Sequence, residues 1–371
     1  MWSQWVMSDS TCIHRSTGGS ALPPPGDATL DSATEAFLSF KIHNKGRSQH
    51  TAQIYRRALG RLEAFLLELE RPWQQACHED LVIFTGLWLH RRGLKDPLSR
   101  RTHIAAVREF YKWAWQRGLV AAWVAEHVPY PDVGRRIPAV MTLASAEKLM
   151  WAPDFETFEG VRDAAILAVL IGCGPRVSGI VGLNESNVVR TAVDGHPRMV
   201  LKVTEKGKKE RLLPVPEQAA LLLGIYLEHP ALAEIDRALP DGDRVLFVNL
   251  NNRMVPEHEY RGEHRRLKRR SILDMVKRYG RRAGLPEDQL HPHAMRHLFG
   301  TELVEEDTNM LTVQMLLGHA DPKTSEIYTH TALRKLSRVI DKANPLAKMK
   351  TPASELLSKL KAMGAGRSGR A

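Results

Sequence analysis

The sequence has 371 residues, with 53 lysines and arginines against 42 aspartates and glutamates, and a formal net charge of +11. This length suits two domains plus tails, and the positive charge favours a polyanionic partner such as nucleic acid. The three cysteines (Cys12, Cys77, Cys173) are too far apart for a disulfide scaffold, and the longest apolar run, residues 164–172, is about half the length of a membrane span.

Residues 1–27 include a Ser-Thr-Gly-Gly-Ser stretch and the run Pro23-Pro24-Pro25-Gly26, a composition that cannot bury a core. We expect a flexible leader there. Residues 1–16 lack a basic segment followed by an apolar one, so the sequence predicts no secretory signal. Together with the sparse cysteines, this favours a reducing cytoplasm.

Residues 28–130 predict a small all-α domain. Apolar residues recur at helical spacing of 4, 3, 4 and 3 at Tyr55, Leu59, Leu62, Leu66 and Leu69. Ser48 or Thr51 could cap the start of that helix. Further helices are expected over residues 32–42, 79–91 and 102–117. Exposed cations on this domain, among them Arg56, Arg100 and Arg101, are candidates for DNA contact, with a solvated face as the alternative.

Prolines and a glycine in residues 131–137 indicate a linker to a second domain over residues 138–345. Its pattern is mixed. Helices are expected over residues 145–151, 161–172, 178–183, 217–228, 264–282, 293–304 and 311–317. Strands are expected over residues 199–204 and 211–215, which would form a hairpin turning at Gly207, and over residues 245–250.

The predicted helix over residues 264–282 is unusually basic and has one apolar side. This density favours contact with DNA phosphates, with one or two side chains reading bases. The candidate residues are Arg265, Arg266, Lys268, Arg269, Arg270, Lys277 and Arg278. Lys208 and Lys209, at the predicted hairpin turn, are further candidates.

Four short motifs in the second domain bring together residue types suited to phosphodiester transfer. They are Gly-Pro-Arg176-Val-Ser, Glu-Lys206-Gly-Lys-Lys-Glu-Arg, His293-Ala-Met-Arg296-His, and Leu-Leu-Gly-His319 followed nine residues later by Tyr328. Guanidinium groups match phosphate oxygens in bidentate fashion, and a tyrosine hydroxyl becomes a nucleophile when a neighbouring charge or base activates it. His293 and Arg296 are three residues apart, so on a helix they share a face.

The order and content of these motifs resemble the tyrosine recombinase (phage integrase) family, especially its compact Xer-like members. The resemblance covers residues 28–343. It implies a mainly α fold with a small β-sheet: an N-terminal all-α, SAM-like core-binding domain, then an α+β catalytic domain. It also implies a catalytic set of Tyr328, Arg176, Lys206, His293, Arg296 and His319.

The resemblance further implies a reaction. Tyr328 would form a 3′-phosphotyrosyl bond and release a 5′ hydroxyl, with Lys206 as the general acid. Bond energy is kept in the phosphotyrosine, so no metal, ATP or other cofactor is expected. The implied function is a site-specific DNA recombinase of a bacterium or mobile element, acting on double-stranded recombination sites as a tetrameric synapse, with accessory proteins an open question.

Two positions depart from the family pattern. Gly179 stands where the family has an acidic residue that orients the first arginine, and Pro175 stands where an aliphatic residue is usual. Glu185 is a candidate substitute for the absent carboxylate. The departure at Gly179 keeps an alternative open, namely a catalytically impaired DNA-binding relative that acts as a recombination accessory protein.

Two other rivals come from the same residues. A metal-dependent nuclease could use His291, His293, His297 and Glu302, although neighbours two apart on a helix diverge. A relaxing type IB topoisomerase shares the tyrosine chemistry, but the separate small helical domain favours a recombinase. The tail, residues 346–371, carries an apolar stripe at Leu356, Leu357, Leu360 and Met363, which we expect to pack on a neighbouring protomer.

Overall fold

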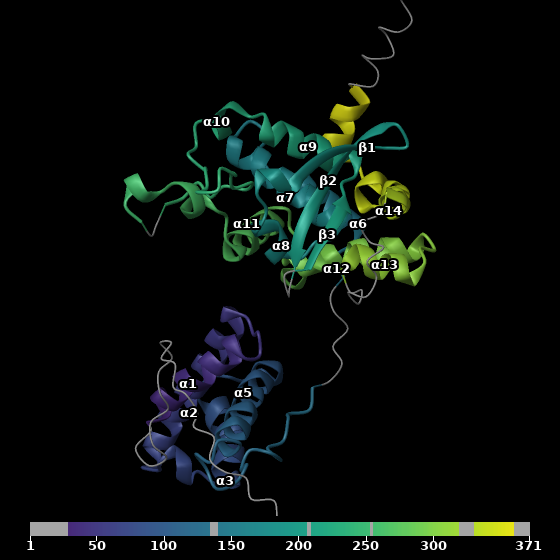
Figure 1. Cartoon of the computed structure of the whole chain (residues 1–371). Coiled ribbons are helices and arrows are strands. Elements are labelled where there is room, and N and C mark those ends of the chain that lie inside the picture. Colours follow the sequence, from purple (N-terminus) through teal and green to yellow (C-terminus); the bar gives the residue numbers. More distant parts are fainter. Residues whose placement is uncertain (1–28, 134–139, 206–208, 253–254, 319–329, 360–371) are drawn as a thin grey trace, which may run out of the picture. The chain divides into compact units, whose positions relative to one another are not determined.

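The computed structural model describes residues 29–133, 140–205, 209–252, 255–318 and 330–359. The chain divides into two compact units, Met1–Arg136 and Ile137–Ala371, and each has its own hydrophobic core (Figure 1). No helix in the described ranges is both long and apolar enough to cross a membrane.

All the secondary-structure elements in the described residues of the first unit are helices, which confirms the predicted all-α domain. Its elements are α1 (Leu30–His43), α2 (Gln49–Glu68), η1 (Trp73–Gln75), α3 (His78–Ile83), the π-helical turn η2 (Phe84–Trp88), α4 (Leu89–Arg91) and α5 (Pro97–Trp115). Ser48 caps α2, as predicted, by accepting a hydrogen bond from the Thr51 backbone N–H at 3.2 Å. Buried aromatic rings fill the core, with Phe37 and Phe110 edge to face at 5.6 Å between centroids.

The second unit combines helices with one small sheet, as predicted. Its longer elements are α6 (Leu143–Met150), α7 (Phe158–Cys173), α8 (Val177–Val181), β1 (Val188–Val193), β2 (His196–Glu205), β3 (Lys209–Pro214), α9 (Glu217–Leu227), α10 (Pro230–Ala233), α11 (Arg269–Arg282), α12 (Pro292–Glu305), α13 (Met310–Leu317) and α14 (His330–Ala343). Its short 3₁₀ helices are η3 (Glu185–Asn187), η4 (Glu257–Glu259), η5 (Gly262–Arg265), η6 (Glu287–Gln289) and η8 (Pro345–Lys348).

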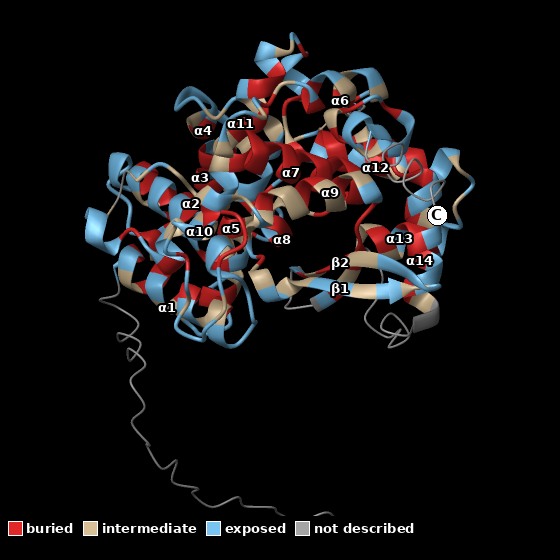
Figure 2. Ribbon diagram, turned by 90° about the horizontal axis from the view of Figure 1, so that it is seen from above, coloured by how far each residue is buried: buried red, intermediate tan, exposed pale blue. Residues whose placement is uncertain are grey.

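Helix α7 is the centre of the second unit. Its residues from Gly160 to Cys173 are buried, and Figure 2 shows it almost entirely red between its neighbours. Thr157 caps its start by accepting from the Gly160 backbone N–H at 3.0 Å, and Gly174 ends it at φ +58°. Helices α9 and α12 pack against it, so the ends of α7 fix the positions of elements far apart in sequence.

The sheet is antiparallel with the order β1-β2-β3. The predicted hairpin is confirmed as β2 and β3, in which Val203 pairs with Arg211. Strand β1 was not predicted. It joins β2 through Asp194 and Gly195, both with positive φ, as a two-residue hairpin turn requires.

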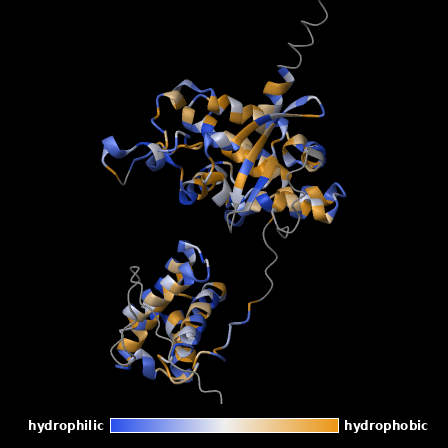
Figure 3. Cartoon of the chain, in the orientation of Figure 1, coloured by the Kyte–Doolittle hydropathy of each residue, from blue (hydrophilic) through white to orange (hydrophobic). Residues whose placement is uncertain are grey.

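Two other expectations were wrong. Residues 245–250 form no strand, because Val245 and Val248 make only isolated bridges. The basic helix begins at Arg269 rather than at residue 264, since the 3₁₀ helix η5 and an extended Arg266 precede it. The segment before α11 projects from the second unit around η4 and is mostly hydrophilic (Figures 1 and 3).

Candidate active site

Helix α12 presents the His293-Ala-Met-Arg296 motif in its first turns. Pro292 occupies the first helical position, and the His291 ring Nδ1 accepts a hydrogen bond from the Ala294 backbone N–H at 3.0 Å. His293 is exposed, whereas the Arg296 residue is only 8% exposed. The cap therefore fixes a helix start from which one accessible imidazole and one buried guanidinium project.

The Arg296 guanidinium links three elements. Its Nη1 donates to the Gly174 carbonyl at the end of α7, at 2.7 Å, and its Nη2 donates to the Leu317 carbonyl at the end of α13. Helix ends have carbonyls without intrahelical partners, and a cation near them is favourable. Arg296 thus binds together the chain just before Arg176 and the chain just before His319.

Arg176 follows a tight exit from α7. Gly174 has a left-handed backbone, and a Cβ there would lie 2.3 Å from the Phe299 ring of α12, so only glycine fits. The half-buried Arg176 then caps α8 by its position, with its carbonyl accepting the Gly179 N–H at 2.9 Å. Burial lowers the pKa of Arg296 to about 9, and the positive charges of Arg176 and Arg211 act in the same direction.

A third arginine of the same cluster, Arg211 on β3, is buried like Arg296. In the sequence it is only one cation of a crowded basic turn. Its Nη1 donates to the Leu316 carbonyl, and burial and the charge of Arg176 lower its pKa to about 10. The signal that could have found it is strand alternation, because Arg211 faces the same side as buried Leu213.

The imidazole of His293 stands among cations. Partial desolvation, followed by the charges of Arg296, His291, His297 and Arg176, lowers its pKa. The lowered pKa favours the neutral form of the imidazole, which can accept a proton.

Three of the predicted catalytic residues, Lys206, His319 and Tyr328, lie outside the described residues, as does Lys208. The described chain reaches both sides of the segment that contains His319 and Tyr328. Helix α13 ends at Gly318 with φ +69°, directly before His319, and α14 begins two residues after Tyr328.

Two family models match the chain: the phage integrase family over residues 139–334 and the phage integrase N-terminal SAM-like domain over residues 34–118. The chain belongs to the phage integrase family of tyrosine recombinases. It is 32% identical to the tyrosine recombinase XerD of Pseudomonas putida over 311 residues, 84% of this chain and 96% of that protein. It is 31% identical to the tyrosine recombinase XerC of Pseudomonas syringae over 327 residues, 88% of this chain and all of that one.

Solved structures of this family share the fold. A XerH site-specific recombinase bound to a palindromic difH substrate, in a post-cleavage complex, has a TM-score of 0.58 at 16% identity, over 84% of this chain and 83% of that one. A lambda integrase tetramer bound to a Holliday junction has a TM-score of 0.55 at 14% identity, over 80% of this chain and 79% of that one.

Gly179 marks the departure from the usual acidic position of such recombinases. It is buried in α8, and a Cβ there would lie 2.5 Å from Val203 Cγ1 of β2. Glu185, the candidate substitute, forms ion pairs with Arg237 at 2.9 Å and with Arg244 at 3.9 Å. Its carboxylate is thus engaged by arginines other than Arg176.

Residues that could have formed the metal site of a nuclease make other contacts. His291 caps α12, and the Glu302 carboxylate pairs with Lys348 at 2.9 Å. Among the residues that the structure describes, no group of three His, Cys, Asp or Glu side chains is placed to hold a metal ion.

The basic candidates on and before α11 differ in what they contact. Lys268, Arg269 and Arg270 are exposed at the start of the helix, and Lys277 is half-buried. By contrast, Arg266 donates to the Val181 and Leu183 carbonyls and to Asn184, which ties the projecting segment to the end of α8. The Arg265 guanidinium lies 3.8 Å from the centroid of the Tyr260 ring.

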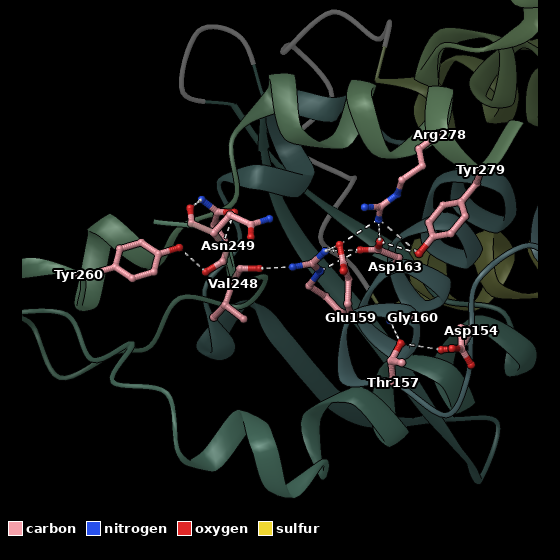
Figure 4. Close-up of polar contacts among 12 residues, drawn as sticks. Asp154, Thr157, Glu159, Gly160, Asp163, Val248, Asn249, Tyr260, Arg278 and Tyr279 are labelled. Carbon is pink, nitrogen blue, oxygen red and sulfur yellow. Dashed lines mark hydrogen bonds and ion pairs between the residues drawn. The ribbon is translucent and has the colours of Figure 1, made fainter. Parts of the chain in front are cut away.

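Arg278, whose side chain is 52% exposed, belongs to an ion network around the buried Asp163 that joins α11 to α7. Its Nη2 lies 2.9 Å from Glu159 and 3.0 Å from Asp163, and the Tyr279 hydroxyl donates to the same Asp163 oxygen at 3.0 Å (Figure 4). Arg162 pairs with the other Asp163 oxygen at 2.6 Å. A cavity of about 960 Å³ lies over this network, between the projecting segment and α11.

The three candidates for DNA contact on the first unit also differ in their contacts and exposure. Arg56 pairs with Glu35 at 2.7 Å, and both side chains are largely exposed. Arg101 is exposed and lies over the Tyr130 ring at 5.1 Å, whereas Arg100 is half-buried. Lys209, the first residue of β3, completes the predicted set.

Proposed function

We propose that the chain is a site-specific recombinase that cleaves and rejoins DNA through a covalent 3′-phosphotyrosyl bond at Tyr328. The observation that carries this proposal is the frame around Arg296. Its hydrogen bonds join Gly174, two residues before Arg176, to Leu317, two residues before His319. Gly174 and Leu317, more than a hundred positions apart in the sequence, thereby lie against one guanidinium group, and this supports a phosphate site formed around Arg176 and Arg296.

The reaction assigns a step to each residue. The guanidinium groups of Arg176 and Arg296, with His319, bind the nonbridging oxygens of the scissile phosphate and oppose their developing charge. The Tyr328 oxygen attacks phosphorus, and its proton passes to the neutral imidazole of His293. The bond from phosphorus to the 5′ oxygen breaks, and Lys206 supplies a proton to that oxygen. Attack by a 5′ hydroxyl reverses these steps and joins the strands.

The DNA is held by cations around this centre. In this proposal Lys268, Arg269, Arg270 and Lys277 of α11 contact phosphates, together with Lys208 and Lys209 of the hairpin and Arg56, Arg100 and Arg101 of the first unit. Arg265, Arg266 and Arg278 were also DNA-contact candidates. Their observed contacts to Tyr260, to the end of α8 and to Asp163 favour a role in orienting α11 instead. By analogy with the lambda integrase tetramer on a Holliday junction, we propose a homotetramer on two sites.

A covalent-capture experiment tests this function without a known target sequence. Nicked, fragmented DNA from the genetic neighbourhood is incubated with the full chain in EDTA, and protein–DNA adducts that resist SDS are collected and sequenced. We expect adducts with the wild type and with Tyr130→Phe, an exposed tyrosine, and none with Tyr328→Phe. Tight DNA binding without any adduct would instead support the recombination accessory protein, the alternative that Gly179 favours.

A further inference from the structure

Arg211 is a buried cation that the steps above do not use. It lies on β3 opposite Val203 of β2, and only 7% of the residue is exposed. A buried charge is unfavourable unless polar groups or an opposite charge compensate it. If this position only required packing, a leucine would give a more stable fold than an arginine. The contacts of Arg211 therefore indicate a further role.

The contacts of Arg211 and Arg296 fall on consecutive carbonyls. Arg211 donates to the Leu316 carbonyl and Arg296 to the Leu317 carbonyl, in the last turn of α13. The helix stops at the next residue, Gly318, in the left-handed conformation. Two guanidinium groups therefore hold the point from which the chain departs toward His319 and Tyr328.

The same two arginines repel each other and Arg176. Burial is the main cause of the lowered pKa of Arg211, and the charge of Arg176 comes second. For Arg296, the charges of Arg176 and Arg211 follow burial in lowering the pKa. Such a cluster of like charges is relieved when an anion joins it, and a phosphate diester is an anion of the size that guanidinium groups bind.

We infer that Arg211 is a positioning residue of the strand-cleavage site: it fixes the end of α13 before His319 and Tyr328 and adds a third positive charge beside Arg176 and Arg296. This inference rests on the proposed function. The charge and the fork-shaped donor geometry of Arg211 both matter, and this distinguishes the role from simple packing.

The experiment compares Arg211→Met and Arg211→Lys with Arg190→Met, an exposed arginine on β1 of the same sheet. Each full-length variant is mixed with a nicked DNA carrying the site recovered from the wild-type adducts. Adduct formation is timed under single-turnover conditions, and DNA affinity and the thermal midpoint are measured alongside. We expect a rate lower by about 10²–10³ for Arg211→Met at saturating DNA, with affinity nearly kept, and no change for Arg190→Met.

A pH series separates charge from packing. A buried lysine has a lowered pKa, so the Arg211→Lys variant is charged and partly active in mild acid and loses its charge as pH rises. Relative to the wild type at each pH, its rate should therefore fall toward that of Arg211→Met between about pH 6 and pH 9. If Arg211→Met folds poorly, this ratio for Arg211→Lys still decides.

The outcomes divide cleanly. A wild type that forms no adduct dependent on Tyr328 would overturn the proposed function and this inference with it. Two outcomes would overturn this inference alone, with normal adducts from the wild type. In the first, Arg211→Met forms adducts at the wild-type rate. In the second, Arg211→Met and Arg211→Lys have equal rates at every pH, and a lower thermal midpoint accounts for the loss.

Discussion

At position 179, the packing of a neighbouring side chain, rather than a role in the reaction, explains why the residue is glycine. A side chain at this position would meet Val203 Cγ1 at 2.5 Å, closer than real Cβ contacts. The absence of a carboxylate in α8 is thus matched by a bulky β-branched residue on β2. The two positions form one packing unit beside Arg176.

Gly179→Ala should lower the free energy of unfolding by about 1–3 kcal/mol, because the added methyl group overpacks a closed site. In the double variant with Val203→Ala, the loss should be smaller than the sum of the two single losses, since the clash is removed. Chemical denaturation of the full-length variants measures this. Gly182→Ala, whose Cβ would have only ordinary contacts from 3.4 Å, is the control. Strict additivity would contradict the packing explanation.

Sequence patterns predicted the positions of some site residues and missed the role of others. The three-residue spacing of His293 and Arg296 predicted that both lie on one face of a helix. The structure confirms the helix, α12, on which His293 is exposed and Arg296 is buried. The role of Arg211 could not be read from spacing, because its partner, the Leu316 carbonyl, lies at the end of a helix far along the chain. Strand alternation could indicate that Arg211 is buried, but its contact with the end of α13 depends on tertiary packing, about which local periodicity carries no information.

At the scale of elements, the sequence predicted a helix or strand correctly where its apolar residues followed a single clear periodicity. Buried helices such as α7 were found within a few residues of their ends, whereas β1 was missed because its residues are mostly half-buried or exposed. The Asp194-Gly195 pair was the available signal for its hairpin. The apolar run over residues 245–248 is buried without strand partners beyond isolated bridges, so burial there was mistaken for a strand.

The ion network beneath the cavity joins two elements that the sequence could not relate. Asp163, fully buried in α7, receives Arg162, Arg278 and the Tyr279 hydroxyl (Figure 4). Burial raises the pKa of this carboxyl, and the ion pair with Arg162 and the hydrogen bond from Tyr279 act in the opposite direction. The network fixes the roll of α11 and therefore which of its cations face outward.

Asp163→Asn should lower the free energy of unfolding by about 3–5 kcal/mol, because it replaces the nearest carboxylate of the buried Arg162, at 2.6 Å, with a neutral amide. The matched control is Asp274→Asn, which removes an exposed pair with Arg270 on the same helix α11 and should change stability by less than about 0.5 kcal/mol. Urea denaturation of both full-length variants compares them. Equal effects would mean that the network contributes no more than a surface ion pair.

At the scale of the whole chain, the tail is partly a component of the second unit. Beyond α14, Leu346, Met349, Thr351 and Ala353 are buried, and Gln218 of α9 bonds both the Leu346 carbonyl and the Thr351 hydroxyl at 2.8 Å. Residues 352–359 are helical, and Leu356 on this helix is 36% exposed. Leu360 and Met363, the rest of the predicted stripe, lie outside the described residues.

The described part of the tail therefore stabilises its own unit up to Ala353, and Leu356 is the first exposed residue of the predicted stripe. Deleting residues 356–371 should change the free energy of unfolding by less than about 0.5 kcal/mol and leave the binding of a single protomer to DNA intact. It should weaken the assembly of several protomers on DNA, because it removes the apolar residues of the predicted stripe, Leu356, Leu357, Leu360 and Met363. Sedimentation velocity with DNA carrying two sites measures both species.

Deletion of residues 346–371 is the informative contrast. It removes the buried Leu346 and Met349 as well as the Lys348 ion pair with Glu302 at the end of α12, so stability should fall by several kcal/mol, at about 2–5 kcal/mol for each large buried side chain lost. Because α12 carries His293 and Arg296, adduct formation should fall with it. If the shorter deletion left the multi-protomer complex sedimenting as the wild type does, the predicted apolar stripe would have no part in assembly.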